Sequence, residues 1–99
     1  MRFDWDDDKN AENKRKHSLS FELAAEVFDD PFHVVTEDQV VDGERRFWAL
    51  GRLQNLVVIV VVHTYFEIRG EEGLEEGVRI ISARKATPRE RGFYEEEAE

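Results

Sequence analysis

The sequence predicts an α+β fold in a single domain over residues 1–99: a mainly antiparallel sheet with two N-terminal helices and one C-terminal helix. Two observations predict this class. Strand-like segments follow one another from residue 32 to residue 86, and helical patterns lie before and after them. A length of 99 residues suits one core, and a hydrophobic content of 40% is enough to build it.

The N-terminal part is predicted from capping signals and apolar spacing. Residues 2–5 form a short predicted strand. A polar helix opens at residues 6–8 and closes with basic residues at 14–16, so its charges complement the helix dipole at both ends. This helix has few apolar positions and is expected to pack lightly at the edge of the fold. Ser20 is the expected N-cap of a second helix, which Pro31 ends. The apolar stripe of that helix consists of Phe21, Ala24, Ala25 and Phe28.

Four strand-like segments and a final helix follow. The predicted strands cover residues 32–37, 45–53, 56–66 and 77–86, with turns at residues 42–43 and 54–55. The run LVVIVVV is apolar at every position and rich in β-branched residues, which predicts a central strand covered on both faces. The last helix starts with Thr87 as N-cap and Pro88 at its first position. The acidic stretch 67–77 is interpreted as an extended hairpin tip or a flexible loop.

Composition excludes several classes of protein. The chain contains no cysteine, which excludes disulfides and thiol catalysis. Its start lacks the pattern of a signal peptide, and its apolar runs are far shorter than the ~20 residues of a membrane span, so a soluble, cytoplasmic protein is expected. A net charge of −9 disfavours general nucleic-acid binding. The basic residues nevertheless concentrate in two windows, 9–16 and 79–91, and the second joins a strand end to a helix start.

Two long motifs carry a resemblance to a known family. KHSLSFELAAEVFDDP spans residues 16–31, and RIISARKATPRER spans residues 79–91. Together with RRFWALGRL and VVVHT between them, they make nearly the whole chain resemble the BrnT family of bacterial toxins. The resemblance implies a RelE-like fold and a metal-independent endoribonuclease of a type II toxin–antitoxin pair, which arrests translation and needs no cofactor. It also implies neutralisation by a small ribbon-helix-helix antitoxin of the BrnA type, through which the complex binds operator DNA.

Cleavage of RNA without a metal requires cations that stabilise the charge of the phosphorane. Arg84 and Lys85 are the candidates, because they lie in a cationic turn where a strand ends. Adjacent strand residues point to opposite faces, so both reach one phosphate only if the strand ends or bulges there. The alternative is that one of the two is a solvated surface charge. Arg79 is expected on the face of Lys85 if the strand is regular. There it either lines the site or pairs with an acid of the neighbouring strand.

Three further residues are candidates for catalysis. His63 ends the apolar run, where it is either a general acid or base or a hydrogen-bonded core residue. Glu90 forms a capping box with Thr87, which explains it without catalysis, and the alternatives are that it orients Arg84 or acts as a base. Tyr94 lies one turn further along the same helix. It is either catalytic, as a C-terminal tyrosine can be in RelE-like nucleases, or packed in the core.

Binding of RNA or antitoxin is assigned to six other basic residues of these two regions: Lys14, Arg15, Lys16, His17, Arg89 and Arg91. The three histidines lack metal-ligand spacing, so no metal site is expected. The aromatic residues Trp5, Trp48, Phe21 and Phe28 are interpreted as core. An alternative function is a catalytically idle module that binds an antitoxin or DNA-binding partner and modulates transcription, since basic strips on an acidic body also suit a charged peptide helix.

Overall fold

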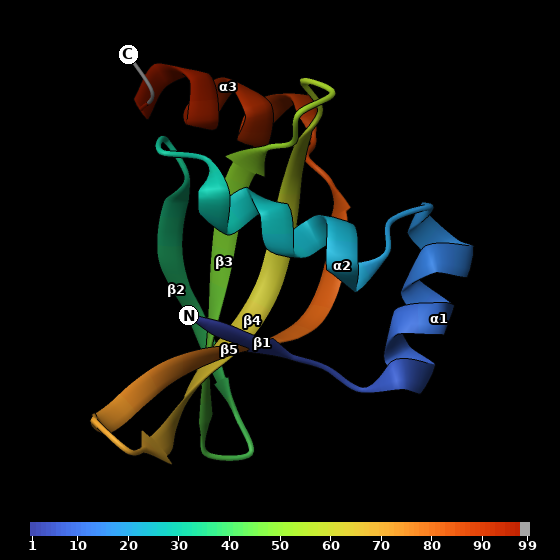
Figure 1. Cartoon of the computed structure of the whole chain (residues 1–99). Coiled ribbons are helices and arrows are strands. Elements are labelled where there is room, and N and C mark those ends of the chain that lie inside the picture. The colour runs from blue at the N-terminus through green and yellow to red at the C-terminus, as the bar shows by residue number, and fades with distance from the viewer. Residues whose placement is uncertain (98–99) are drawn as a thin grey trace.

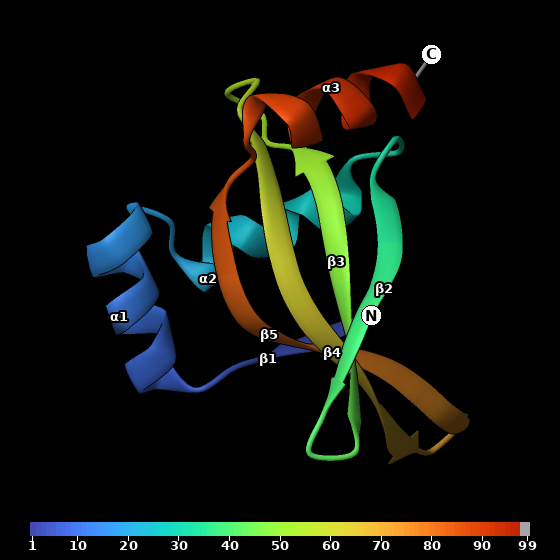
Figure 2. The same ribbon diagram turned by 180° about the vertical axis from the view of Figure 1, so that it is seen from behind.

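A five-stranded mixed sheet and three α-helices make up the computed structural model, which describes residues 1–97 (Figures 1 and 2). The strands are β1 (Arg2–Asp4), β2 (Val34–Val41), β3 (Glu44–Arg52), β4 (Val58–Gly70) and β5 (Gly73–Lys85). The helices are α1 (Asp7–His17), α2 (Phe21–Ala24), which continues as the 3₁₀ helix η1 (Ala25–Asp29), and α3 (Pro88–Glu97). The strand order is β1-β5-β4-β3-β2. β1 pairs parallel with β5, and the other neighbours are antiparallel, so the predicted α+β class is confirmed with a mixed sheet.

Strand β4 is central and covered on both faces, as the apolar run 56–62 predicts, but it begins only at Val58, and Leu56 is 75% exposed in the preceding turn. On one face Ile59 and Val61 belong to the main core beneath α2 and η1. On the other face Val58 and Val60 pack with Tyr94 of α3. Helices α2 and α3 thus cover opposite faces of the sheet, and α3 crosses only the end where β5 leads into it (Figures 1 and 2).

Helix α1 is held by one buried polar side chain. Asn13 is 6% exposed, and its amide nitrogen donates to the carbonyl oxygens of Leu19 and Ala83, each at 2.9 Å. Its amide oxygen accepts from the backbone N–H of Ala83 at 3.1 Å. β1 pairs only with residues 77–79 of β5, so at Ala83 the Asn13 amide takes the place of a neighbouring strand. The polar helix therefore lies at the edge of the sheet, as expected, but with a specific attachment.

The acidic stretch 67–77 continues β4 and β5 as a two-stranded ribbon. The ladder runs without interruption to the pair formed by Gly70 and Gly73, where Gly73 has a φ of 115° that favours glycine. Of the two alternatives given for this stretch, an extended hairpin tip or a flexible loop, the hairpin tip is confirmed. The predicted strand 56–66 ends too early and the predicted strand 77–86 begins too late, because the charges of an exposed ribbon resemble those of a loop. The ribbon projects from the end of the sheet opposite α3, so it does not cover Arg84 and Lys85, which end β5 just before α3 (Figure 1).

The second predicted helix is shorter than its apolar stripe suggests. Ser20 caps it, accepting from the N–H of Leu23 at 3.1 Å, but the regular helix ends at Ala24 and continues as η1. η1 packs closely on β3, since a Cβ at Gly51 would lie 2.6 Å from Cγ1 of Val27. The 3₁₀ helix η1 is wound more tightly than an α-helix, and this winding is compatible with the close approach of Val27 to β3.

Candidate nucleic-acid interface

A bulge in β5 decides which way its basic side chains face. Ser82 pairs with Val62 and Ile80 pairs with His63, so Ile81 is an extra residue with no partner of its own in the ladder. A bulge of this kind reverses the alternation of side chains beyond it.

The bulge brings two arginines to one face of the sheet. Arg79 pairs with Thr64 and Arg84 pairs with Val60. Because Thr64 and Val60 are four residues apart on the regular strand β4, Arg79 and Arg84 share a face. The expectation that Arg79 lies on the face of Lys85 is wrong, since it assumed a regular strand. Lys85 pairs with Ile59 and lies on the opposite face, so it does not join Arg84 at one phosphate.

These arginines belong to the face opposite α2, towards which Figure 2 looks. A row of residues in register crosses it from β2 to β5: Thr36, Trp48, Val62 and Ser82. Arg84 lies on the α3 side of this row, whereas Arg79 and Arg46 lie on the other side. We call these seven residues the open face. The Nε of Arg46 is buried and, within residues 1–97, has no hydrogen-bond partner.

Arg84 is held in place by an acid and an aromatic ring. Its guanidinium donates to Glu90 at 2.7 and 3.0 Å and lies 5.5 Å from the centroid of the Trp48 ring. The predicted capping box is present, with Glu90 accepting from the Thr87 N–H at 2.9 Å and the Thr87 hydroxyl accepting from the Glu90 N–H at 3.2 Å. Glu90 thereby joins the start of α3 to the cation.

The hydrogen bond from Arg84 lowers the pKa of Glu90 to about 2, against an opposing effect of burial and with further help from the Thr87 N–H. The carboxylate is therefore ionised at neutral pH and is a poor proton acceptor, since an effective general base has a pKa near the working pH. The low pKa therefore favours the role in which Glu90 orients Arg84 and disfavours the role in which Glu90 acts as the base.

Arg79 forms an ion pair with Asp4 of β1 at 2.5 Å, and both side chains are about half exposed. Of the two alternatives given for Arg79, the structure thus has the pairing with an acid of the neighbouring strand. The pair stands at the rim of the open face. An exposed pair of this kind contributes little to stability, so it can open to bind a phosphate at low cost.

His63 lies in the core, on the opposite face from Arg84. Its ring centroid is 5.0 Å from those of Phe28 and Tyr65 and 6.0 Å from that of Phe47. Burial lowers its pKa, and within residues 1–97 its Nε2 has no hydrogen-bond partner. The structure therefore does not bring His63 to the arginines.

Tyr94 is also buried, at 2% exposure. Its hydroxyl donates to Oδ2 of Asp30 at 2.5 Å, and the same carboxylate accepts from the N–H groups of Phe32 and Arg52. Burial and the hydrogen bond to Asp30 raise the pKa of Tyr94 to about 12. Tyr94 therefore joins α3 to the ends of η1 and β3.

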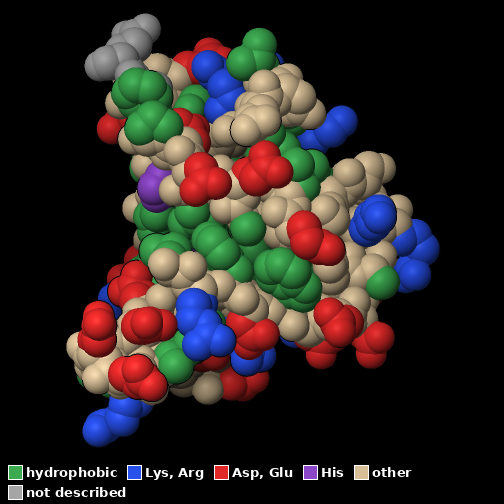
Figure 3. All heavy atoms as spheres, viewed as in Figure 1, with side chains coloured by type: hydrophobic (Ala, Val, Ile, Leu, Met, Phe, Trp, Pro, Cys, Tyr) green, Lys and Arg blue, Asp and Glu red, His purple; other side chains and the backbone are tan. Residues whose placement is uncertain are grey.

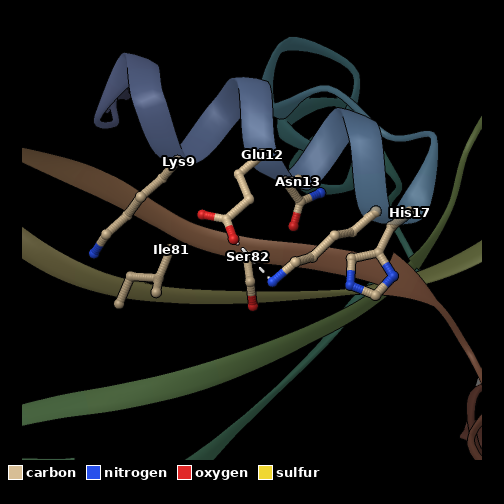
Figure 4. A pocket seen from close by; sticks show the side chains of 7 residues that line it. Lys9, Glu12, Asn13, His17, Ile81 and Ser82 are labelled. Atoms are coloured by element: carbon tan, nitrogen blue, oxygen red, sulfur yellow. Dashed lines mark ion pairs between the residues drawn. The ribbon is translucent and has the colours of Figure 1, made fainter.

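Two hollows lie at the ends of the Thr36–Ser82 row. The first, which we call the α3 groove, has a volume of about 290 Å³ and is lined by Val34, Thr36, Trp48, Leu50, Arg89, Glu90 and Phe93. The second, which we call the α1 pocket, has a volume of about 260 Å³ and is lined by Lys9, Glu12, Asn13, Lys16, His17, Ile81 and Ser82 (Figure 4). In it Lys16 forms an ion pair with Glu12 at 2.8 Å.

The other basic candidates are distributed around these hollows. Arg89 lines the α3 groove, and Lys16 and His17 line the α1 pocket. Lys14, Arg15 and Arg91 are exposed but line neither hollow.

Of the seven residues of the open face, sequence reasoning named only Arg79 and Arg84 as site candidates, and the two most informative residues that it missed are Arg46 and Trp48. Trp48, interpreted as core, is only partly buried and lies beneath Arg84. Strand alternation alone places Arg46 and Trp48 on one face and Phe47 on the other, and this signal was available in the segment RRFWALGRL.

The face of the sheet that carries α2 exposes hydrophobic side chains. Hydrophobic side chains gather below α2 in Figure 3. Phe3, 36% exposed, has its ring centroid 5.5 Å from that of Phe28, and Tyr65, 37% exposed, has its centroid 4.9 Å from that of Phe47. We call these four residues the aromatic patch. Contiguous apolar surface of this kind is typical of a protein–protein contact.

Within residues 1–97 no three His, Asp or Glu side chains gather in a way that would hold a metal ion. The helices described there are all too short or too polar to cross a membrane.

Comparison with known proteins agrees with the resemblance seen in the motifs. Residues 5–90 match the family model for the ribonuclease toxin, BrnT, of type II toxin–antitoxin systems. The chain is similar to the 1.1 Å crystal structure of the Brucella abortus ribonuclease toxin, BrnT, with 27% identity and a TM-score of 0.58 over 88% of this chain and 97% of that one. No curated protein matches it. The chain therefore belongs to the BrnT family of ribonuclease toxins of type II toxin–antitoxin systems.

Proposed function

We propose that this protein is a metal-independent endoribonuclease toxin with a RelE-like fold, which binds RNA on the open face, cleaves it and so arrests translation. The observation that carries the proposal is the convergence of Arg79, Arg84 and Arg46 around the Thr36–Ser82 row. The charge of the whole chain opposes RNA, but this face presents cations next to an aromatic ring, a combination that suits single-stranded nucleic acid.

Cleavage of RNA requires three events at such a site. The 2′-hydroxyl loses its proton as its oxygen attacks phosphorus, the phosphorane gains negative charge, and the departing 5′-oxygen takes up a proton. Arg84 is suited to the second task, because Glu90 and Trp48 hold its planar fork in place before the substrate arrives. Arg79 supplies a second cation once its exposed pair with Asp4 opens.

His17 is the residue proposed to move protons. An imidazole is the side chain best suited to this task at neutral pH. His63 is buried among aromatic rings, whereas His17 is exposed and lines the α1 pocket together with Ser82, which ends the row (Figure 4). Lys16 in the same pocket adds a cation beside it.

The proposal is tested by incubating the protein with protein-free and ribosome-bound RNA in EDTA. The wild type is expected to cleave at least one of these substrates. His17→Gln is expected to cleave about 10²-fold or more slowly, the effect of losing a general acid–base group. His33→Gln is the matched control, since His33 packs against Phe28 away from the open face. Cleavage only after a metal is added, or equal rates for both variants, contradicts the mechanism. Absence of cleavage from both substrates would favour the catalytically idle module.

The partner proposed for the aromatic patch is the antitoxin, a small ribbon-helix-helix protein of the BrnA type that carries the complex to operator DNA. The patch faces away from the arginines, and Glu67 and Glu76 pair next to Tyr65 and Val78, so it suits an apolar and basic segment. Tyr65→Ser is expected to weaken inhibition by the antitoxin at least tenfold without changing cleavage. Leu56→Ser, an exposed apolar change at the other end of the sheet, is the control. Unchanged inhibition of Tyr65→Ser would place the antitoxin elsewhere.

A further inference from the structure

We propose that the α3 groove binds one base of the RNA, and that the base it prefers is guanine. The inference rests on the proposed function, because it places the groove next to the phosphate held at Arg84. It deepens that function by assigning a base-recognition site to residues of β2, β3 and α3.

The walls of the α3 groove suit a flat aromatic ligand. Trp48 of β3 and Phe93 of α3 both line it, and Val34 and Leu50 add apolar surface. Phe93 is 45% exposed although it lies only one residue from the buried Tyr94. A phenyl ring left in water at the edge of a hollow gains by stacking on a base, and any base has the π-face this requires.

The volume of the groove also fits a single ring system. About 290 Å³ lies at the lower limit of the ~300–1,000 Å³ typical of small-molecule sites. The hollow therefore accommodates a base with its edge at the rim and does not require a longer ligand.

Polar groups at the rim favour a base that offers acceptors. The Glu90 carboxylate is already occupied by Arg84 and the Thr87 N–H, so it has little capacity left for an amino group. Arg89 contributes only N–H donors, and Thr36 contributes a hydroxyl. The guanidinium fork of arginine matches the O6 and N7 acceptors of guanine, whereas adenine and cytosine present amino groups at the equivalent positions.

Trp48 connects the base to the phosphate site. The guanidinium of Arg84 lies over its ring, and the same side chain lines the groove. Arg84 lies on β5 and Trp48 on β3, two strand spacings or about 10 Å apart in the sheet. A nucleotide with its base in the groove therefore directs its phosphate towards Arg84.

Binding of nucleoside monophosphates tests this site apart from catalysis. In a Trp5→Phe background the remaining tryptophan is Trp48, so its fluorescence reports on the groove. GMP is expected to change this fluorescence and to bind about tenfold more tightly than CMP or AMP. Phe93→Ala is expected to weaken GMP binding roughly 5- to 100-fold, the effect of removing one stacking aromatic. Arg89→Ala is expected to remove the preference for GMP over CMP and AMP.

Phe32→Ala is the matched control, because Phe32 is exposed to a similar degree and lines a different hollow, next to Tyr94. Equal affinities for GMP, AMP and CMP, or GMP binding that Phe93→Ala leaves unchanged, would overturn the proposal. Mapping of cleavage sites gives the second readout: Phe93→Ala and Arg89→Ala should spread cuts over all four bases, where the wild type cuts beside guanine. If the wild type binds GMP but cleaves no RNA, the base-binding site is supported and the proposed nuclease function is contradicted.

Discussion

Arg84→Ala is expected to lower the rate of RNA cleavage by about 10²–10³-fold, the effect of removing one preorganised group that stabilises developing charge. The reason is geometric as well as electrostatic. Glu90 and Trp48 hold the guanidinium on the open face, so its orientation costs little when the phosphorane forms. Arg84→Lys keeps the charge but loses the planar fork, and it should recover only part of the rate. Single-turnover cleavage in EDTA measures these differences.

The control for this experiment is Arg69→Ala, an exposed cation of β4 in the ribbon that projects from the end of the sheet opposite α3 (Figure 1), which should cleave within a few-fold of the wild type. Removal of Arg84 also leaves the half-buried Glu90 without its ion-pair partner. The double variant Arg84→Ala/Glu90→Gln avoids that unpaired charge, and it should be folded and equally slow. A folded double variant with the rate of the wild type would remove Arg84 from the mechanism.

The ion pair between Arg84 and Glu90 should also make the stability of the fold depend on pH. Because Arg84 lowers the folded-state pKa of Glu90 to about 2 from an ordinary 4.5, its contribution is present above pH 4.5 and is lost as the pH falls towards 2. The difference in unfolding free energy between wild type and the Arg84→Ala/Glu90→Gln variant should therefore shrink over this interval. A constant difference would show that the pair does not stabilise α3.

Asn13→Ala is expected to destabilise the fold by about 3–5 kcal/mol. The substitution leaves the carbonyl oxygens of Leu19 and Ala83 and the N–H of Ala83 without their partner, and each unsatisfied buried group costs about 1–3 kcal/mol. Water that enters from the neighbouring α1 pocket offsets part of this cost. Denaturant unfolding followed by circular dichroism measures the change.

Asn13→Asp provides an isosteric comparison, because it retains one acceptor but can no longer donate to the two carbonyl oxygens. It should be destabilised nearly as much as Asn13→Ala. Asn55→Ala is the matched control: its side chain accepts one exposed hydrogen bond from the Val57 N–H, and its loss should cost less than about 1 kcal/mol. Equal stability of Asn13→Ala and Asn55→Ala would mean that α1 is attached to the sheet by other contacts.

Local sequence signals determined the elements of this fold. Ser20 and the Thr87–Glu90 capping box mark helix starts through bonds to backbone groups within three residues, so they can be read without tertiary context. The run 56–62 predicted a strand covered on both faces, because no polar side chain in it requires water. The two long motifs also identified the family, whose model matches residues 5–90.

The open face could not be predicted from these signals, because one bulged residue decides it. If β5 were regular, with Ile81 paired in the ladder, Arg79 and Arg84 would be five positions apart and would lie on opposite faces of the sheet, and nothing in the local sequence marks the position of the bulge. Asn13 supports the neighbouring part of β5 from 70 positions away in the chain, a pairing that no periodicity reveals. The sequence thus determined which helices and strands form and which family they belong to. Only the tertiary structure decided which side chains meet, because strand register and long-range hydrogen bonds set the faces on which they lie.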